Sequence, residues 1–121
     1  MIRFNSVSKM YDTNVFALKN LTLNINKGEF VFITGNSGAG KSTLLKLLYG
    51  ELKPSDGNIL IHGKEVQSLS RSKLAYLRRQ MGIIFQDFKL LWDRTVLDNV
   101  CLPLHIWGKD KDADRIRNST L

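Results

Sequence analysis

The sequence is poor in cysteine and proline and has no long apolar run. It contains one cysteine, Cys101, and two prolines in 121 residues. One cysteine excludes an internal disulfide, and we expect Cys101 to be a small buried apolar residue. No apolar run reaches the roughly 20 residues that span a bilayer, and residues 1–4 do not begin a signal peptide. These features favour the cytosol, or a membrane surface that faces it.

Negative charge is also scarce, because 18 lysines and arginines outweigh 11 acidic residues and give a net charge of +7. Such a balance favours anionic partners: nucleotide phosphates, nucleic acid or anionic lipid. The basic residues are scattered along the chain. Their densest cluster is on a predicted amphipathic helix, which favours a solvated helix face: Arg71, Lys73, Arg78 and Arg79.

Several segments have the pattern of β-strands. Residues 2–7 and 17–25 alternate apolar and polar side chains, as half-buried strands do. Residues 30–34 are apolar almost throughout, which predicts a central parallel strand covered on both sides. Residues 82–86 predict a second buried strand. Turn residues at 53–57 precede a short predicted hairpin over 58–66.

Three segments favour helices. Residues 41–50 carry leucines around much of the helix, so we expect it to be largely buried and to stop at Gly50. Ser70 is a candidate cap for a helix over 71–80. A third helix is predicted to start near Thr95 and to be limited by Pro103. Residues from 109 onward are polar and charged, and the chain ends there without visible closure of a fold.

The most informative motif lies between the first apolar strand and the first helix. It fits the pattern G-x-x-x-x-G-K-[ST] in full, and chance predicts roughly 0.01 such matches in a chain of this composition. Its residues, with the threonine that follows, are Gly35, Asn36, Ser37, Gly38, Ala39, Gly40, Lys41, Ser42 and Thr43. We call residues 35–43 the glycine-rich motif.

The chemistry of this motif suits a bound polyphosphate. Its glycines let successive backbone N–H groups point at an anion, and the following helix adds the positive end of its dipole. Lys41 is a charged donor for the terminal phosphates. The Ser42 hydroxyl is placed to ligate Mg²⁺, and Thr43 can hydrogen-bond an inner phosphate. We therefore expect the motif to bind the triphosphate of Mg-ATP.

The residues around the motif resemble those of the ATP-binding-cassette (ABC) ATPases. Tyr11 lies between the first two strands, where this family has an aromatic residue that stacks on adenine. Gln86 ends a buried strand, like the glutamine that in this family contacts Mg²⁺ and the attacking water. The resemblance implies an α/β fold, a P-loop NTPase core with an N-terminal antiparallel β subdomain. It also implies catalytic roles for Lys41 and Gln86, and a preference for ATP over GTP.

Within the family, the chain is most similar to cell-division ATP-binding subunits of the FtsE type. The similarity spans roughly residues 1–117 and includes Phe-Gln-Asp-Phe-Lys-Leu-Leu at 85–91 and Asp-Arg-Thr-Val at 93–96. Trp92 departs from the proline usual at that place. The resemblance implies a peripheral protein at the cytoplasmic face of the membrane. It would dimerise as a full-length protein and contact an FtsX-like permease through the segment after Gln86.

The sequence lacks three other elements of that family: a Leu-Ser-Gly-Gly-Gln signature, an apolar strand ending in Asp-Glu (Walker B), and a switch histidine. We expect residues 1–121 to form the N-terminal part of an ABC-type domain, with Walker A and the Q-loop present. Hydrolysis needs a carboxylate that activates water and donors that stabilise the transferring phosphoryl group. The chain is therefore expected to bind ATP with little or no turnover alone, and its unpaired strand edges favour self-association.

Other readings stay open. Residues 88–92 suit membrane-subunit docking and plain core packing equally. Trp92 and Trp107 are expected to be packing residues and not base-stacking surfaces. His62 is expected on the surface of the hairpin and not in a metal site, because the other histidine, His105, is far along the chain. A lipoprotein-release or macrolide-export ATPase shares the general layout. A nucleic-acid-binding module would use the positive charge, but no known nucleic-acid motif is present, so no nucleic acid is expected. A truncated product without activity is the last alternative.

Overall fold

A computed structural model describes residues 1–12 and 14–119 of the chain. The chain divides into two units, one formed by Met1–Arg78 and the other by the residues from Arg79 onward. Each unit is considered by itself. In the described part of the chain, no helix is both long enough and apolar enough to cross a membrane.

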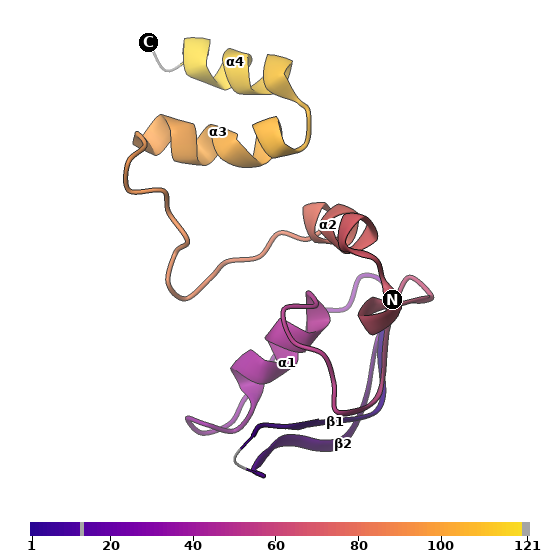
Figure 1. The fold of residues 1–121 in the computed structure, drawn as a ribbon. Helices are drawn as coiled ribbons and strands as arrows, with labels where there is room; N and C mark the ends of the chain where they lie inside the picture. The colour runs from indigo at the N-terminus through magenta and orange to yellow at the C-terminus, as the bar shows by residue number, and fades with distance from the viewer. Residues whose placement is uncertain (13, 120–121) are drawn as a thin grey trace. The chain divides into compact units, whose positions relative to one another are not determined.

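The first unit is built around a four-stranded antiparallel sheet of order β2-β1-β3-β4; Figure 1 labels its neighbouring strands β1 and β2. Its strands are β1 (Ile2–Met10), β2 (Phe16–Ile25), β3 (Asp56–Ile61) and β4 (Lys64–Glu65). β1 is central, since Phe4 pairs with Leu23 on one side and with Ile59 on the other. This sheet confirms both predicted half-buried strands, the hairpin and the antiparallel β subdomain.

The core of the sheet depends on an irregularity in β1. Phe4 and Val7 are both fully buried, although residues three apart on a regular strand face opposite sides. The pairing register shifts between these two residues, and Ser6 has a φ of 48°. This bulge brings a second apolar side chain of β1 into the core. Fully burying a side chain such as Phe4 stabilises the fold by roughly 1.5–3 kcal/mol.

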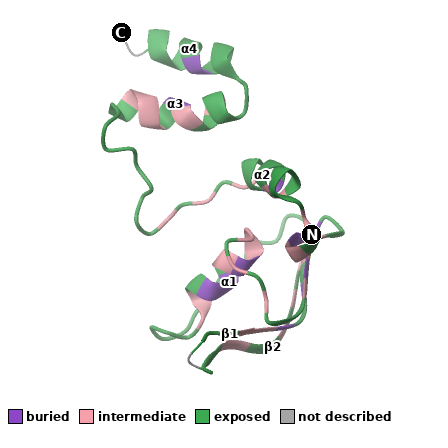
Figure 2. Ribbon diagram, in the orientation of Figure 1, coloured by how far each residue is buried: buried purple, intermediate pink, exposed green. Residues whose placement is uncertain are grey.

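Helix α1 (Lys41–Leu48) follows the glycine-rich motif and is buried in part (Figure 2). Thr43, Leu44 and Leu47 are buried, most other residues of 41–50 are intermediate, and Leu45 is half exposed, so the prediction of a largely buried helix holds only partly. The helix ends as predicted at Gly50, whose φ is 69° and whose N–H donates to the Leu47 carbonyl at 3.1 Å. Glycine suits this left-handed position at a helix end. Arg78 stabilises the same end by donating to the carbonyls of Tyr49 and Gly50 at 2.9 and 3.0 Å.

A short 3-10 turn, η1 (Val66–Ser68), and helix α2 (Arg71–Arg79) complete the first unit. The predicted helix over 71–80 is confirmed. The Ser70 hydroxyl lies 3.2 Å from the Ser72 hydroxyl, and the Ser70 carbonyl accepts from Leu74 N–H at 2.8 Å. Most of α2 is exposed, which agrees with a solvated basic face.

The two predicted buried strands are not strands in this structure. Residues 30–34 and 82–86 have irregular backbone, and Phe30 and Ile84 are 84% and 98% exposed. A central parallel strand forms only when neighbouring strands satisfy its hydrogen bonds and cover its faces. Within the described residues, no strand pairs with either segment. Phe30 and Phe32 instead contact each other edge to face, with ring centroids 4.9 Å apart.

The second unit contains two helices, α3 (Val96–Ile106) and α4 (Asp110–Ser119), which lie side by side (Figure 1). Helix α3 starts near Thr95, as predicted, and the Thr95 side chain caps it by accepting from Asp98 N–H at 3.1 Å. Cys101 is fully buried and lies 3.7 Å from the Ala113 carbonyl of α4, which confirms its predicted burial. Arg117 of α4 pairs with Asp98 of α3 at 2.6 Å.

The expected limit of this helix at Pro103 is wrong. Pro103 lies inside α3, and the helix continues to Ile106. Proline removes one backbone donor and disfavours the helical conformation before it. The packing of Cys101 against α4 supports the helix on the N-terminal side of Pro103. Beyond it, the Pro103 carbonyl accepts from Trp107 N–H at 3.1 Å.

Candidate functional site

The glycine-rich motif runs from an irregular segment into the first turn of α1. Three of its glycines are required by the backbone, since Gly35, Gly38 and Gly40 have φ values of 152°, 80° and 88°, which side chains disfavour. Gly40 is also confined sterically, because a Cβ atom there would lie 2.3 Å from the Ala17 carbonyl oxygen of β2. The close approach between this turn and β2 is therefore open only to glycine.

Lys41 closes the motif on itself. Its ammonium group donates to the carbonyl oxygens of Gly35 and Asn36 at 2.7 and 2.6 Å. The Asn36 carbonyl also accepts from Ala39 N–H at 3.2 Å, which tightens the turn. The Lys41 side chain therefore lies across the loop. In this position its ammonium group would be near an anion bound by the loop amides.

The positive end of the helix dipole at the start of α1 is not balanced by a negatively charged side chain in the first turn. The first hydrogen bond of the helix runs from Leu44 N–H to the Gly40 carbonyl at 2.9 Å, so the preceding amides have no partner inside the helix. No acidic residue lies in the first turn. Ser42 is exposed beside them, whereas Thr43 is buried with 8% of its surface accessible. This arrangement favours an anion at the helix start.

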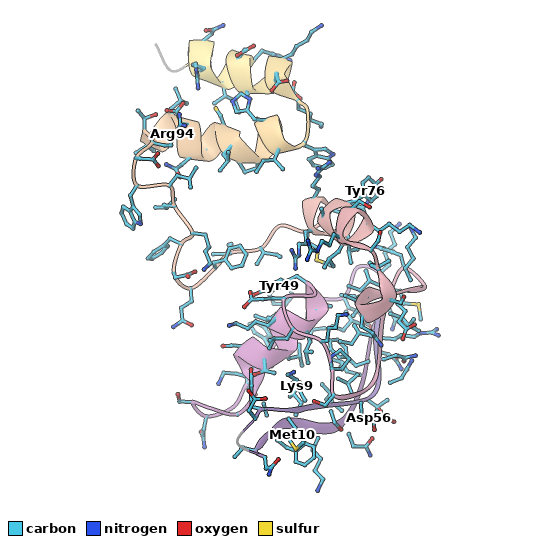
Figure 3. All side chains as sticks on the ribbon, in the orientation of Figure 1. Lys9, Met10, Tyr49, Asp56, Tyr76 and Arg94 are labelled. Atoms are coloured by element: carbon cyan, nitrogen blue, oxygen red, sulfur yellow. The ribbon has the colours of Figure 1, made fainter. Side chains whose placement is uncertain are left out.

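Tyr11 lies against this turn, although 32 positions separate it from Thr43. Its hydroxyl is 3.2 Å from Thr43 Oγ1. Tyr11 is 41% exposed, and the ammonium group of Lys9 on β1 (Figure 3) is 5.7 Å from the centroid of its ring. The structure therefore brings Tyr11 to the glycine-rich motif. The bond to Thr43 had no signal in the sequence, because it joins residues 32 positions apart.

The remaining predicted residues are described where they stand. Gln86 belongs to the second unit, and its role at Mg²⁺ stays a prediction. His62 is exposed in the hairpin turn, as expected, and His105 Nδ1 pairs with Asp110 at 2.8 Å. The described residues contain no group of three or more histidine, cysteine and acidic side chains that could hold a metal ion.

Two carboxyl groups have shifted pKa values outside the motif. The pKa of Glu29 is lowered, first by the hydrogen bond from the Asn26 side chain and then by the Asn26 backbone. The distances are 2.8 Å from Nδ2 and 2.6 Å from the backbone nitrogen. This contact fixes the turn before residues 30–34. The pKa of Asp98 is lowered chiefly by the Thr95 hydroxyl, with Arg117 also contributing.

The apolar segment after Gln86, residues 88–92, lies open in the second unit. Phe88 and Trp92 are 73% and 86% exposed, so plain core packing does not account for them in this structure. The Asn99 side chain on α3 fixes the segment by accepting from Leu91 N–H at 2.8 Å and donating to its carbonyl at 3.0 Å. An exposed apolar cluster with a fixed backbone suits contact with another protein.

Comparison with protein families gives one decisive result: the family model described as ABC transporter matches residues 18–120. This chain belongs to the ABC transporter family. The recognition of an ABC ATP-binding domain from the glycine-rich motif, Tyr11 and residues 82–96 is therefore confirmed.

Curated relatives include proteins of several roles. The chain is 50% identical over 119 residues to the cell division ATP-binding protein FtsE of Escherichia coli K12, covering 98% of this chain and 54% of that protein. FtsE of Bacillus subtilis is 43% identical, with 97% and 51% covered. The methionine import ATP-binding protein MetN of Latilactobacillus sakei is 42% identical, with 92% and 33% covered. The chain spans about half the length of the FtsE relatives.

Solved structures establish the fold. The dimeric structure of MJ0796, a bacterial ABC transporter cassette, is 41% identical with a TM-score of 0.82, covering 90% of this chain and 48% of that chain. MJ0796 in a post-hydrolysis state bound to ADP and Pi gives a TM-score of 0.82 at 36% identity, covering 98% and 55%. The predicted ABC ATPase fold, present as a partial-length domain, is confirmed.

Proposed function

We propose that the chain is the nucleotide-binding part of an FtsE-like ABC subunit and that residues 35–43 bind the triphosphate of ATP. The observation that carries this proposal is the self-closed motif. Glycine conformations, the free amides of α1 and the Lys41 ammonium converge there with no acidic residue in the first turn. Tyr11 lies beside the same turn and supplies an exposed aromatic face for the base.

The residues present fit Mg-ATP. The exposed Ser42 hydroxyl would hold Mg²⁺, and the ion would neutralise charge on the terminal phosphates. Gln86 is assigned to the same ion from the family resemblance alone. Lys41 would exchange its two carbonyl partners for phosphate oxygens, which form stronger charge-assisted hydrogen bonds. The amides at the start of α1 would hold the inner phosphates. Lys41 and Gln86 are the residues of this chain to which we assign catalytic roles.

We further propose that residues 1–121 bind ATP without turning it over efficiently. The sequence contains Walker A and the Q-loop glutamine but no signature, Walker B carboxylate or switch histidine. Without a carboxylate to orient water, hydrolysis lacks its general base. Steady phosphate release by the purified chain that falls in Lys41→Ala would contradict this proposal.

The partner follows from the exposed segment after Gln86. We propose that residues 88–92 contact an FtsX-like permease at the cytoplasmic face of the membrane, in cell division, and that the full-length protein works as a homodimer. Among the relatives above, an import protein at 42% identity and one FtsE at 43% are almost equally similar to this chain. The permease pairing therefore needs its own experiment.

A pull-down with candidate permeases tests that pairing. Trp92→Ala should weaken capture of the FtsX-like permease by about tenfold, because aromatic anchors contribute most to interfaces. Trp107→Ala, another exposed tryptophan, is the matched control and should leave capture unchanged. Stronger capture of a lipoprotein-release or macrolide-export permease would favour that alternative instead.

Nucleotide binding is tested directly with a fluorescent ATP analogue in the presence of magnesium. Lys41→Ala should lower affinity by at least about a hundredfold, since hydrogen bonds to charged groups contribute about 1.5–3 kcal/mol each. Lys41 makes two such contacts in the loop and would transfer them to phosphate oxygens. Lys53→Ala, a lysine in the turn before β3, has the same change of charge. Equal affinity in both variants would refute the assignment of the motif.

A further inference from the structure

The hydrogen bond between Tyr11 and Thr43 joins the two halves of the proposed nucleotide site. Thr43 is the buried polar residue of the described part of the chain, with 8% of its surface exposed. A buried hydroxyl needs a partner. The structure gives it the Tyr11 hydroxyl, at a distance of 3.2 Å. Removal of the tyrosine hydroxyl would therefore act on the phosphate side of the site.

The backbone around Tyr11 fixes the position of this hydroxyl. Tyr11 N–H donates to the Val15 carbonyl at 3.1 Å, and the Tyr11 carbonyl accepts from Asn14 N–H at 2.9 Å. One residue earlier, Met10 N–H donates to Ser55 Oγ at 3.1 Å. These hydrogen bonds hold the backbone of Tyr11 and of the residue before it. Such support is what a side chain needs when it positions another group.

The direction of the hydrogen bond decides what Thr43 can do. A threonine hydroxyl has one hydrogen and can accept through its oxygen at the same time. If Tyr11 donates to Thr43 Oγ1, the Thr43 hydrogen remains available for an anion. If Thr43 donated to Tyr11, that hydrogen would be used. An anion at the start of α1 favours the first direction, because hydrogen bonds in a chain polarise and strengthen one another.

We propose that Tyr11 is a positioning residue for the phosphates as well as an aromatic surface for the base. Its hydroxyl donates to Thr43 Oγ1 and so directs the Thr43 hydroxyl at the nucleotide phosphates. This inference rests on the proposed ATP binding by residues 35–43. It differs from stacking because it acts through the hydroxyl, and so it extends to ligands that have no base.

Inorganic triphosphate separates the two roles, because stacking contributes nothing to its binding. Calorimetry with magnesium compares ATP and inorganic triphosphate on the wild-type chain, Tyr11→Phe, Thr43→Val and the double variant. Tyr11→Phe should weaken both ligands by a similar factor of about three to ten, the range for one net hydrogen bond. In the Thr43→Val background, Tyr11→Phe should have no further effect, since the relay is already broken.

Matched variants keep the result interpretable. Tyr49→Phe removes another tyrosine hydroxyl, which donates to Glu51 at 2.7 Å, and should leave both affinities unchanged. Thr43→Ser retains the hydroxyl and should retain the sensitivity to Tyr11→Phe. Circular dichroism and thermal unfolding of each variant show whether a loss of binding comes from misfolding.

The following outcomes overturn the inference. Tyr11→Phe could leave the affinity for inorganic triphosphate unchanged. Alternatively, Tyr11→Phe could weaken binding by the same factor with and without Thr43→Val. A purely structural role would lower the unfolding temperature while the effect on affinity persisted in the Thr43→Val background. A wild-type chain that bound neither ligand would refute the proposed function together with this inference, whereas normal wild-type binding with a neutral Tyr11→Phe refutes the inference alone.

Discussion

The glycine-rich motif and the apolar segment just before it are neighbours in the chain, but they depend on different contacts. The motif is held by short-range bonds, from Lys41 to carbonyls five and six positions away and from Ala39 to Asn36. Residues 30–34 have the composition of a buried strand, yet Phe30 and Phe32 are 84% and 79% exposed. Local geometry forms without distant partners, and a central parallel strand does not.

The antiparallel sheet and residues 82–86 also differ in whether neighbouring strands are present. β1 has neighbours on both sides within the first unit, and its Phe4 is fully buried. Within the described residues, the apolar side chains of 82–86 have no strand beside them, and Ile84 is 98% exposed. Hydrophobic composition alone therefore does not bury a segment, because burial also needs paired backbone groups.

The largest effect that tests this contrast is truncation of a phenylalanine. Phe4→Ala should lower the free energy of unfolding of the first unit by about 3–5 kcal/mol, because it leaves a cavity in the core. Phe32→Ala removes the same atoms from an exposed site and an edge-to-face contact, so it should cost less than about 1.5 kcal/mol. Urea unfolding measures both, and similar losses would show that residues 30–34 are buried in solution.

A second pair of variants tests how tightly the motif is built. At Gly40, φ is 88° and a new Cβ would meet the Ala17 carbonyl oxygen at 2.3 Å. Gly40→Ala should therefore cost about 2–4 kcal/mol. Gly63 also has a positive φ, of 75°, but a Cβ there would meet nothing within 4 Å. Gly63→Ala should cost only about 1–2 kcal/mol, the strain of a left-handed residue.

Urea unfolding of the two glycine variants gives the difference between their costs. Equal costs would contradict the close packing of the motif against β2.

The smallest effect concerns pH in the second unit. Asp98 has a folded-state pKa lowered from its ordinary value of 3.8, so its stabilising contribution is present above that unfolded value. It is lost as pH falls through the lower folded value. Thermal unfolding of the helices from neutral to strongly acidic pH should show this loss, and Asp98→Asn should remove it. An unchanged pH profile in Asp98→Asn would show that the contacts with Thr95 and Arg117 do not stabilise the unit.

The sequence predicted the features that depend on nearby residues. The alternation in β1 and β2, Gly50 at the end of α1, and the start of α3 near Thr95 all follow from local patterns. The two apolar strands were predicted from composition, but strand formation needs partners that the pattern does not contain. Pro103 was expected to limit α3, whereas packing of Cys101 against α4 supports a helix through it.

The candidate site, like the fold, was predictable only in part. The spacing of its residues predicted the glycine-rich motif, and the family resemblance predicted Tyr11. The bond from Tyr11 to Thr43 was not predictable, because it depends on how a turn between two strands lies against a helix 32 positions later. The contact of Lys41 with its own loop was also unforeseen, since the motif predicts a phosphate partner for that ammonium group.

The most direct test of the account is calorimetry of the folded chain with ATP and magnesium, repeated with Lys41→Ala. Circular dichroism beforehand shows that both samples are folded. We expect saturable heat from the wild-type chain and its loss in Lys41→Ala. A folded wild-type chain that gave no heat, or equal heat from both proteins, would contradict the claim that residues 35–43 bind the nucleotide triphosphate.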